Sequence, residues 1–136
     1  MMISIVMYGC RHGTHPEGLH LIYDCRAISN PHHDKRLRYL NGFDQAVRDE
    51  VMRWAPAREL VRRIKRETLE LCRLYEERPE DPASLPVKVG VYCTGGRHRS
   101  VVIGTEVAKE FLLEGLPVQL ELRDRAKWLD NRPGGK

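Results

Sequence analysis

Residues 93–100 hold the side chains best suited to chemistry, and they read Cys-Thr-Gly-Gly-Arg-His-Arg-Ser. A β-branched apolar run ends where this stretch begins, and an apolar helical pattern follows it. A strand that enters a helix through a tight glycine turn presents backbone N–H groups and the positive end of the helix dipole to an anion. Arginine forks, an imidazole and a hydroxyl would add donors that suit phosphate oxygens. The predicted oxyanion-binding residues are Thr94, Gly95, Gly96, Arg97, His98, Arg99 and Ser100. The alternative is a βα turn whose glycines only permit tight packing.

Length and composition indicate one domain over residues 1–136, because 136 residues with 41% hydrophobic content can bury a core of their own. No apolar run is long enough to span a membrane, and the first residues lack the layout of a secretion signal, so we expect a cytoplasmic protein without a membrane partner. A net charge of +4 permits a phosphorylated ligand or RNA without requiring either.

The four cysteines show no CxxC spacing, and we expect reduced thiols. Cys10, His12 and His15 lie close together in the sequence, but no fourth zinc ligand is evident. We therefore predict neither a metal site nor a cofactor.

Alternating apolar runs and helical patterns predict an α/β fold: a mainly parallel four-stranded sheet with helices on both faces, arranged as a single-layer sandwich. The expected strands are 2–7, 19–25, 87–92 and 117–122, and the expected helices are 44–54, 56–77 and 100–114. The helix 56–77 is basic, which leaves RNA contact or a solvated face as alternatives. Residues 131–136 have the composition of a frayed tail.

Ligands of parallel α/β proteins bind at the carboxyl ends of the strands, where three of the expected strands carry polar groups. Asp24 and Arg26 follow one strand, residues 93–100 follow another, and Arg123 with Asp124 follow the last. A long loop over residues 26–41 leaves the first of these ends, and loops of this length in a small domain are commonly functional. We expect these groups to converge on one pocket.

The glycine motif at 93–101 resembles the signature of the carboxyl-terminal domain of the RapZ (RNase adapter protein) family. The resemblance extends to Tyr8-Gly9, to Asp24-Cys25-Arg26 with Asn30-Pro31-His32, and to Leu37-Arg38 and Gly42-Phe43-Asp44, in order along the chain.

This resemblance implies a domain that binds an amino-sugar phosphate, glucosamine-6-phosphate, with RNA- or protein-adapter roles and self-association left open. It implies a pocket formed by His32, Thr94, Gly95, Gly96, His98, Arg99 and Ser100, lined or braced by Asp24, Arg26, Asn30 and Asp44. The family's P-loop domain is not matched here, because the chain contains no GxxxxGK[ST]. Leu122-Arg123 replaces a family His-Arg pair, and the basic tail is thin, so ligand binding is better supported than RNA binding.

A cysteine-dependent phosphatase is the rival interpretation of the same stretch. Cys93 and Arg99 have the C-x5-R spacing, so Cys93 would attack phosphorus while Arg99 holds the oxygens and Asp24 or Asp44 protonates the leaving group. Tyr92 stands where such enzymes place a histidine, and no loop presents an obvious acid. We favour binding without turnover.

Overall fold

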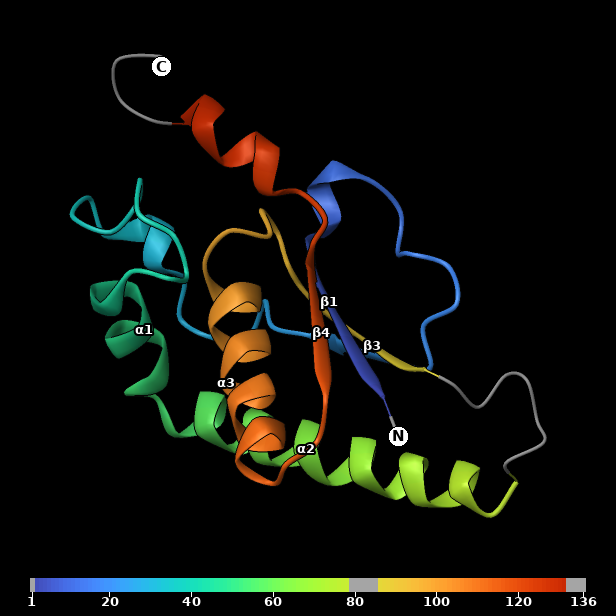
Figure 1. Ribbon diagram of the computed structural model, residues 1–136. Helices are drawn as coiled ribbons and strands as arrows, with labels where there is room; N and C mark the ends of the chain where they lie inside the picture. Colours follow the sequence, from blue (N-terminus) through green and yellow to red (C-terminus); the bar gives the residue numbers. More distant parts are fainter. Residues whose placement is uncertain (1, 79–85, 132–136) are drawn as a thin grey trace.

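Four parallel strands form one sheet in the order β2–β3–β1–β4 (Figure 1). The strands are β1 (Ile3–Gly9), β2 (Leu21–Asp24), β3 (Val87–Cys93) and β4 (Val118–Leu122). The computed structural model describes residues 2–78 and 86–131 of the chain. The two central strands, β1 and β3, are the most apolar and are buried along most of their length, as expected where a parallel strand is covered on both sides.

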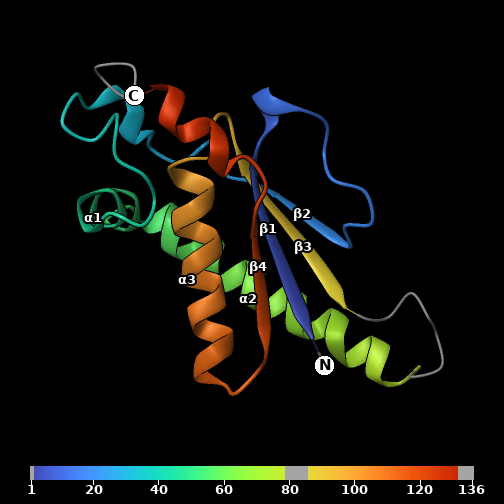
Figure 2. The same cartoon turned by 45° about the horizontal axis from the view of Figure 1, so that its top comes forward.

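Three helices, α1 (Gln45–Met52), α2 (Ala55–Glu76) and α3 (Arg99–Leu113), pack against one another on a single face of this sheet (Figure 2). Gly104 of α3 lies directly over Met7 of β1: a Cβ added there would be 2.5 Å from the Met7 Cγ atom. On the same face, the Tyr23 hydroxyl of β2 donates a hydrogen bond to Glu67 of α2. The buried core therefore lies between this face and the helices.

The α/β class and the four parallel strands are confirmed, but the expectation of helices on both faces is wrong. Residues 10–20 cover the other face without an α-helix, and the Leu19 side chain packs over Gly90. Tyr8 stacks on Tyr92 there, with ring centroids 5.5 Å apart, and the His15 ring meets both edge-on. These aromatic rings fill the space that a helix would otherwise cover.

The predicted elements are present with shifted ends. The second strand is shorter than expected; just before it, the His20 N–H donates to the Lys88 carbonyl while the His20 ring accepts from the Lys88 N–H. A 3-10 helix, η4 (Arg125–Asn131), follows β4 and was not predicted. Of the frayed tail proposed for 131–136, residues 132–136 lie outside the described residues. Within the described ranges, no helix combines the length and apolarity needed to cross a membrane.

The carboxyl ends of β1, β3 and β4 point to the top of Figure 1, and β2, which is parallel to β3, ends beside Tyr92 at the same edge of the sheet. The backbone N–H of Cys25, just after β2, donates to the Tyr92 carbonyl of β3, and the Gly9 N–H of β1 donates to Asp124 after β4. The topology thus brings the segments that follow the four strands to one edge of the sheet, but their polar groups do not all share one pocket: Asp24, Arg26, Arg123 and Asp124 lie outside the lining described below.

Candidate functional site

The turn between β3 and α3 is fixed by close backbone packing against the end of β1. Gly96 has φ +69°, and a Cβ at this position would lie 2.4 Å from the Gly9 nitrogen. Arg11 N–H donates to the Thr94 carbonyl at 3.1 Å, and the Trp128 indole N–H donates to the Gly96 carbonyl at 3.2 Å. Only glycine combines this φ with this approach, so the second glycine of the motif is required by the fold itself.

A pocket of about 160 Å³ opens beside this turn. Its lining residues are Arg11, Asn30, His32, Cys93, Thr94, Gly95, Arg97, His98 and Arg99. No side chain caps the amino end of α3, so the first-turn N–H groups of the helix have no capping oxygen within the described chain. The pocket is positively charged, because its lining holds three arginines and no carboxylate.

Arg99 is the best-placed cation of the pocket. The residue is only 5% exposed, and its Nη1 donates to the carbonyls of Arg26 and Ile28 at 2.7 and 3.1 Å. Its Nε is buried and has no hydrogen-bond partner among the described residues. Leaving such a donor unsatisfied costs about 1–3 kcal/mol. The guanidinium is therefore anchored through Nη1, and its buried Nε is left without a partner in the described chain.

His98 is buried as well, and its Nε2 lies 2.8 Å from the Leu40 carbonyl. A carbonyl only accepts, so Nε2 carries the hydrogen of this bond. Burial, with a contribution from the neighbouring Arg97 guanidinium, lowers the pKa of His98 to about 4. The imidazole is therefore neutral at pH 7, and in this form its Nδ1 accepts hydrogen bonds instead of donating them.

Protonation of His98 should destabilise the fold in acid. The pKa in the folded state, about 4, is below the value of about 6.5 expected in the unfolded chain, so the unfolded state takes up the proton first as pH falls. The stabilisation is present above pH 6.5 and is lost towards pH 4. We expect His98 to account for about 2 kcal/mol of unfolding free energy lost between pH 7 and pH 4.5.

Urea denaturation of wild type and of His98→Gln over this pH range measures the effect. Glutamine keeps an N–H donor for the Leu40 carbonyl but does not titrate. The other histidines are present in both proteins, so their contributions cancel when the two unfolding free energies are subtracted. The same loss of stability with acid in both proteins would contradict the assignment.

Arg97 uses its guanidinium to join segments of the chain. Nε donates to the Leu40 carbonyl, Nη2 to that of Tyr39 and Nη1 to that of Trp128. Its own carbonyl accepts from the Gly42 N–H at 2.8 Å. The predicted ligand residue thus also connects the 39–42 loop and η4 to the turn.

Cys93 and Ser100 contact each other below the turn. The Cys93 thiol lies 3.3 Å from the Ser100 hydroxyl and accepts from the Gly96 N–H at 3.3 Å. Both side chains are buried. Of the two, Cys93 is part of the pocket lining.

The remaining predicted residues divide between the pocket and its surroundings. Asn30 and His32 line the pocket, and the Asn30 side chain accepts from the His32 N–H. Asp24 and Arg26 lie outside the lining and form an exposed ion pair at 2.8 Å. Hydrogen bonding from Arg26 lowers the pKa of Asp24 to about 2. Asp44 also lies outside the lining; it accepts from the Asn41 N–H and precedes α1.

Sequence reasoning missed Arg11, whose guanidinium lies over Gly95 in the pocket. Arg11 follows the carboxyl end of the first expected strand, just as the predicted polar groups follow the other three strands. This position in the sequence could have indicated that Arg11 belongs to the site. Arg123, expected to converge on the pocket, lies outside its lining: it donates to the carbonyls of Gly9 and Thr14 and pairs with the buried Asp124. The described residues contain no group of three or more His, Cys, Asp or Glu side chains that could hold a metal ion, including around Cys10.

Fold and site together define an α/β domain with one all-parallel sheet and a glycine turn that leads past a buried arginine into a helix. The family model described as the RapZ C-terminal domain matches residues 1–126, and the chain belongs to this family. The resemblance drawn from the motifs is confirmed.

Relatives of this chain include longer proteins named "Nucleotide-binding protein". One from Rubrobacter xylanophilus is 38% identical over 109 residues, which are 80% of this chain and 34% of that protein. One from Dictyoglomus turgidum is 39% identical over 106 residues, 78% of this chain and 34% of the relative. A Clostridium acetobutylicum protein is 32% identical over all 136 residues and 44% of its own length. The chain thus spans less than half of these relatives.

Proposed function

We propose that the domain binds a small phosphorylated molecule in the pocket beside the β3–α3 turn. The buried Arg99, with its unpartnered Nε, is the observation that carries this proposal. The Arg99 guanidinium lines the pocket and is not neutralised by a carboxylate there, and a charge-assisted bond from it to a phosphate oxygen is stronger in a desolvated site than in water. The uncapped start of α3 favours the same negative charge.

The size of the pocket favours a phosphoryl group with a small body. Pockets for drug-sized ligands are several times larger, at about 300–1,000 Å³. The remainder of the ligand would extend past Asn30, His32 and Arg11, where polar side chains suit the hydroxyl and amino groups of a sugar.

An amino-sugar phosphate such as glucosamine-6-phosphate is the ligand that we propose, in keeping with membership of the RapZ C-terminal domain family. The longer relatives are named for nucleotide binding, yet this sequence lacks the GxxxxGK[ST] loop, and the pocket is small for a whole nucleotide. An adapter role, in which the bound state is recognised by RNA or protein, is compatible with this function.

Calorimetry against glucosamine-6-phosphate, glucose-6-phosphate, inorganic phosphate and ATP tests the proposal. We expect both sugar phosphates to bind, phosphate to bind more weakly, and the amino sugar to bind most tightly. Binding of ATP with no binding of either sugar phosphate would overturn it.

The contacts of Cys93 favour phosphatase chemistry as a second candidate. A thiol beside a hydroxyl and a backbone N–H, six residues before a buried arginine, is the arrangement that transfers a phosphoryl group to sulfur. A leaving group must also be protonated. The pocket lining contains no carboxyl group, and the pKa of Asp24, about 2, keeps this side chain ionised at neutral pH. Binding without turnover is therefore the better-supported function.

Cys93 should be alkylated slowly by iodoacetamide at mildly acidic pH, because the residue is 2% exposed and a receptor needs no thiolate. Mass spectrometry of tryptic peptides measures the rate, with the more accessible Cys10 as the internal reference. Rapid labelling that phosphate prevents, together with aryl phosphate hydrolysis that Cys93→Ser abolishes, would establish the phosphatase instead.

A further inference from the structure

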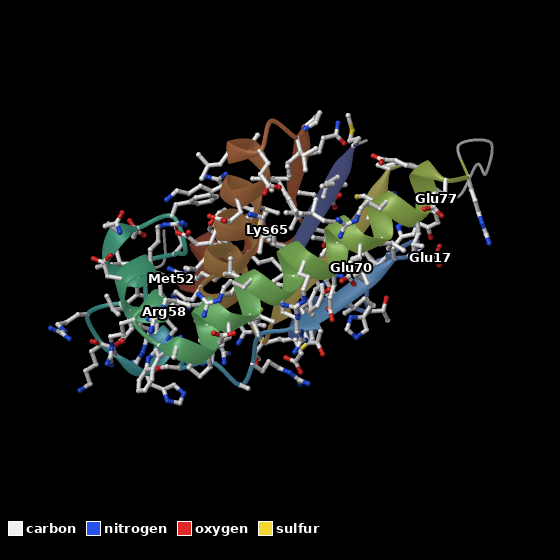
Figure 3. All side chains as sticks on the ribbon, turned by 90° about the horizontal axis from the view of Figure 1, so that it is seen from below. Glu17, Met52, Arg58, Lys65, Glu70 and Glu77 are labelled. Atoms are coloured by element: carbon white, nitrogen blue, oxygen red, sulfur yellow. The ribbon has the colours of Figure 1, made fainter. Side chains whose placement is uncertain are left out.

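A groove that shares no residue with the anion pocket runs along α2 where this helix meets α1 and α3. Its volume is about 620 Å³. Figure 3 shows the groove region from the α2 side, with Met52 and Lys65 on the side of α2 that is nearer to α1 and α3. The lining follows α2 from Arg58 to Arg73, a rise of about 22 Å at 1.5 Å per residue. This length matches about four turns of a second helix.

The floor of the groove is apolar. Met52 of α1 and Val61 and Leu69 of α2 line it, and the first and last of these are only partly buried. Val61 and Leu69 are eight residues apart, so they lie on the same side of α2. Apolar side chains in a row between two helices are the usual seat for the apolar face of a third helix.

Five cations form the rim: Arg58, Arg62, Lys65, Arg66 and Arg73. The two carboxylates in the lining are already paired, since Glu106 contacts Arg48 at 2.5 Å and Glu110 contacts Lys65 at 3.3 Å. Arg66 and Arg73 form no ion pair with any described residue. The groove therefore retains a positive charge that its own neighbours do not neutralise.

The spacing of these arginines weakens the isolated helix. Arg58, Arg62 and Arg66 follow one another at four-residue intervals, and like charges at i,i+4 destabilise a helix by about 0.2–0.5 kcal/mol per pair. Acidic side chains of a partner, placed along Arg58, Arg62 and Arg66, would offset this repulsion between the arginines.

From the apolar floor and the cationic rim we infer that the groove docks an amphipathic helix of a partner protein, with its apolar face on Val61 and Leu69 and an acidic edge along the arginines. Nucleic acid fits this surface less well. The lining contains no aromatic side chain on which a base could stack, and phosphates gain nothing from an apolar floor.

A displayed library of helical peptides, about 15 residues long and randomised at every position, tests the inference with the full chain as bait. We expect the selected peptides to share apolar residues at i, i+3, i+4 and i+7 and Glu or Asp beside them. Binding of a selected peptide should weaken about tenfold or more in Arg66→Glu/Arg73→Glu and decrease with added salt.

Lys109→Glu is the matched control for charge, because Lys109 is exposed on α3 outside the lining. It should change peptide affinity no more than about twofold. Arg99→Ala should leave peptide binding intact, which separates this inference from the proposed ligand function.

Three outcomes would overturn the inference. One is a selection that enriches no acidic amphipathic helix. Another is equal weakening by the groove variants and by Lys109→Glu. The third is an RNA hairpin that binds with dependence on Arg66 and Arg73 while the peptides do not.

Discussion

Replacing Arg99 with alanine should weaken binding of a sugar phosphate about 30- to 150-fold, which corresponds to about 2–3 kcal/mol. The reason is geometric as well as electrostatic. Two backbone carbonyls hold Nη1 in place, so the guanidinium of this lining residue is already fixed before a ligand binds. A preorganised donor loses little entropy on binding. Calorimetry with glucosamine-6-phosphate measures the change.

Two further variants separate the contributions of Arg99. Arg99→Lys keeps the charge but loses the planar fork, and we expect an intermediate loss of about tenfold. Arg53→Ala removes an equal charge from the exposed end of α1, where Arg53 pairs with Glu50, and should leave affinity unchanged. Because Arg99 also holds the 26–28 segment, circular dichroism must show that the alanine variant is folded. A folded Arg99→Ala protein with wild-type affinity would exclude this pocket as the binding site.

Gly96→Ala should lower the free energy of unfolding by about 2–5 kcal/mol. The positive φ of +69° costs an alanine about 1–2 kcal/mol, and the Cβ would come within 2.4 Å of the Gly9 nitrogen. Overpacking against backbone typically adds about 1–3 kcal/mol, because β1 cannot move without disturbing its ladder. Urea denaturation followed by circular dichroism measures the loss.

Gly115→Ala is the matched control for Gly96→Ala. Gly115 has a similar φ of +76°, but nothing lies within 4 Å of the added Cβ. This variant should lose only the conformational part, about 1–2 kcal/mol. An equal loss of unfolding free energy in the two variants would show that the positive φ alone explains the effect of Gly96→Ala. The close approach of the turn to β1 would then contribute nothing to it.

The sequence was sufficient to place the turn because its signal is local. Each part of the strand–turn–helix unit has its own local pattern. The valines up to Val91 predict the strand, Gly95-Gly96 predicts the turn, and the apolar spacing after Ser100 predicts the helix. The cover of the sheet was a different problem. Helices on both faces are usual for parallel sheets. No pattern in residues 10–20 predicted that the rings of Tyr8, His15 and Tyr92 would cover one face instead.

Adjacent arginines show most clearly where sequence reasoning ends. Arg97 and Arg99 are the same residue type and equally buried, and the sequence predicts both as ligand-binding residues. In the structure, the Arg97 guanidinium donates to three carbonyls of other segments, whereas the Arg99 guanidinium keeps its Nε unpartnered in the described chain. Residues far from both in the sequence, such as Leu40 and Trp128, make this difference.

The sequence by itself determined the α/β class, the order of the main elements and the stretch in which an anion site could form, because strand, glycine turn and helix depend on neighbouring residues. Only the tertiary structure decided which donors are available. It neutralised His98 by burial, brought Arg11 to the pocket from the end of β1 and placed Asp24 outside the lining. Burial, pairing and proximity across strands depend on how the chain packs, and residue types along the sequence do not specify them.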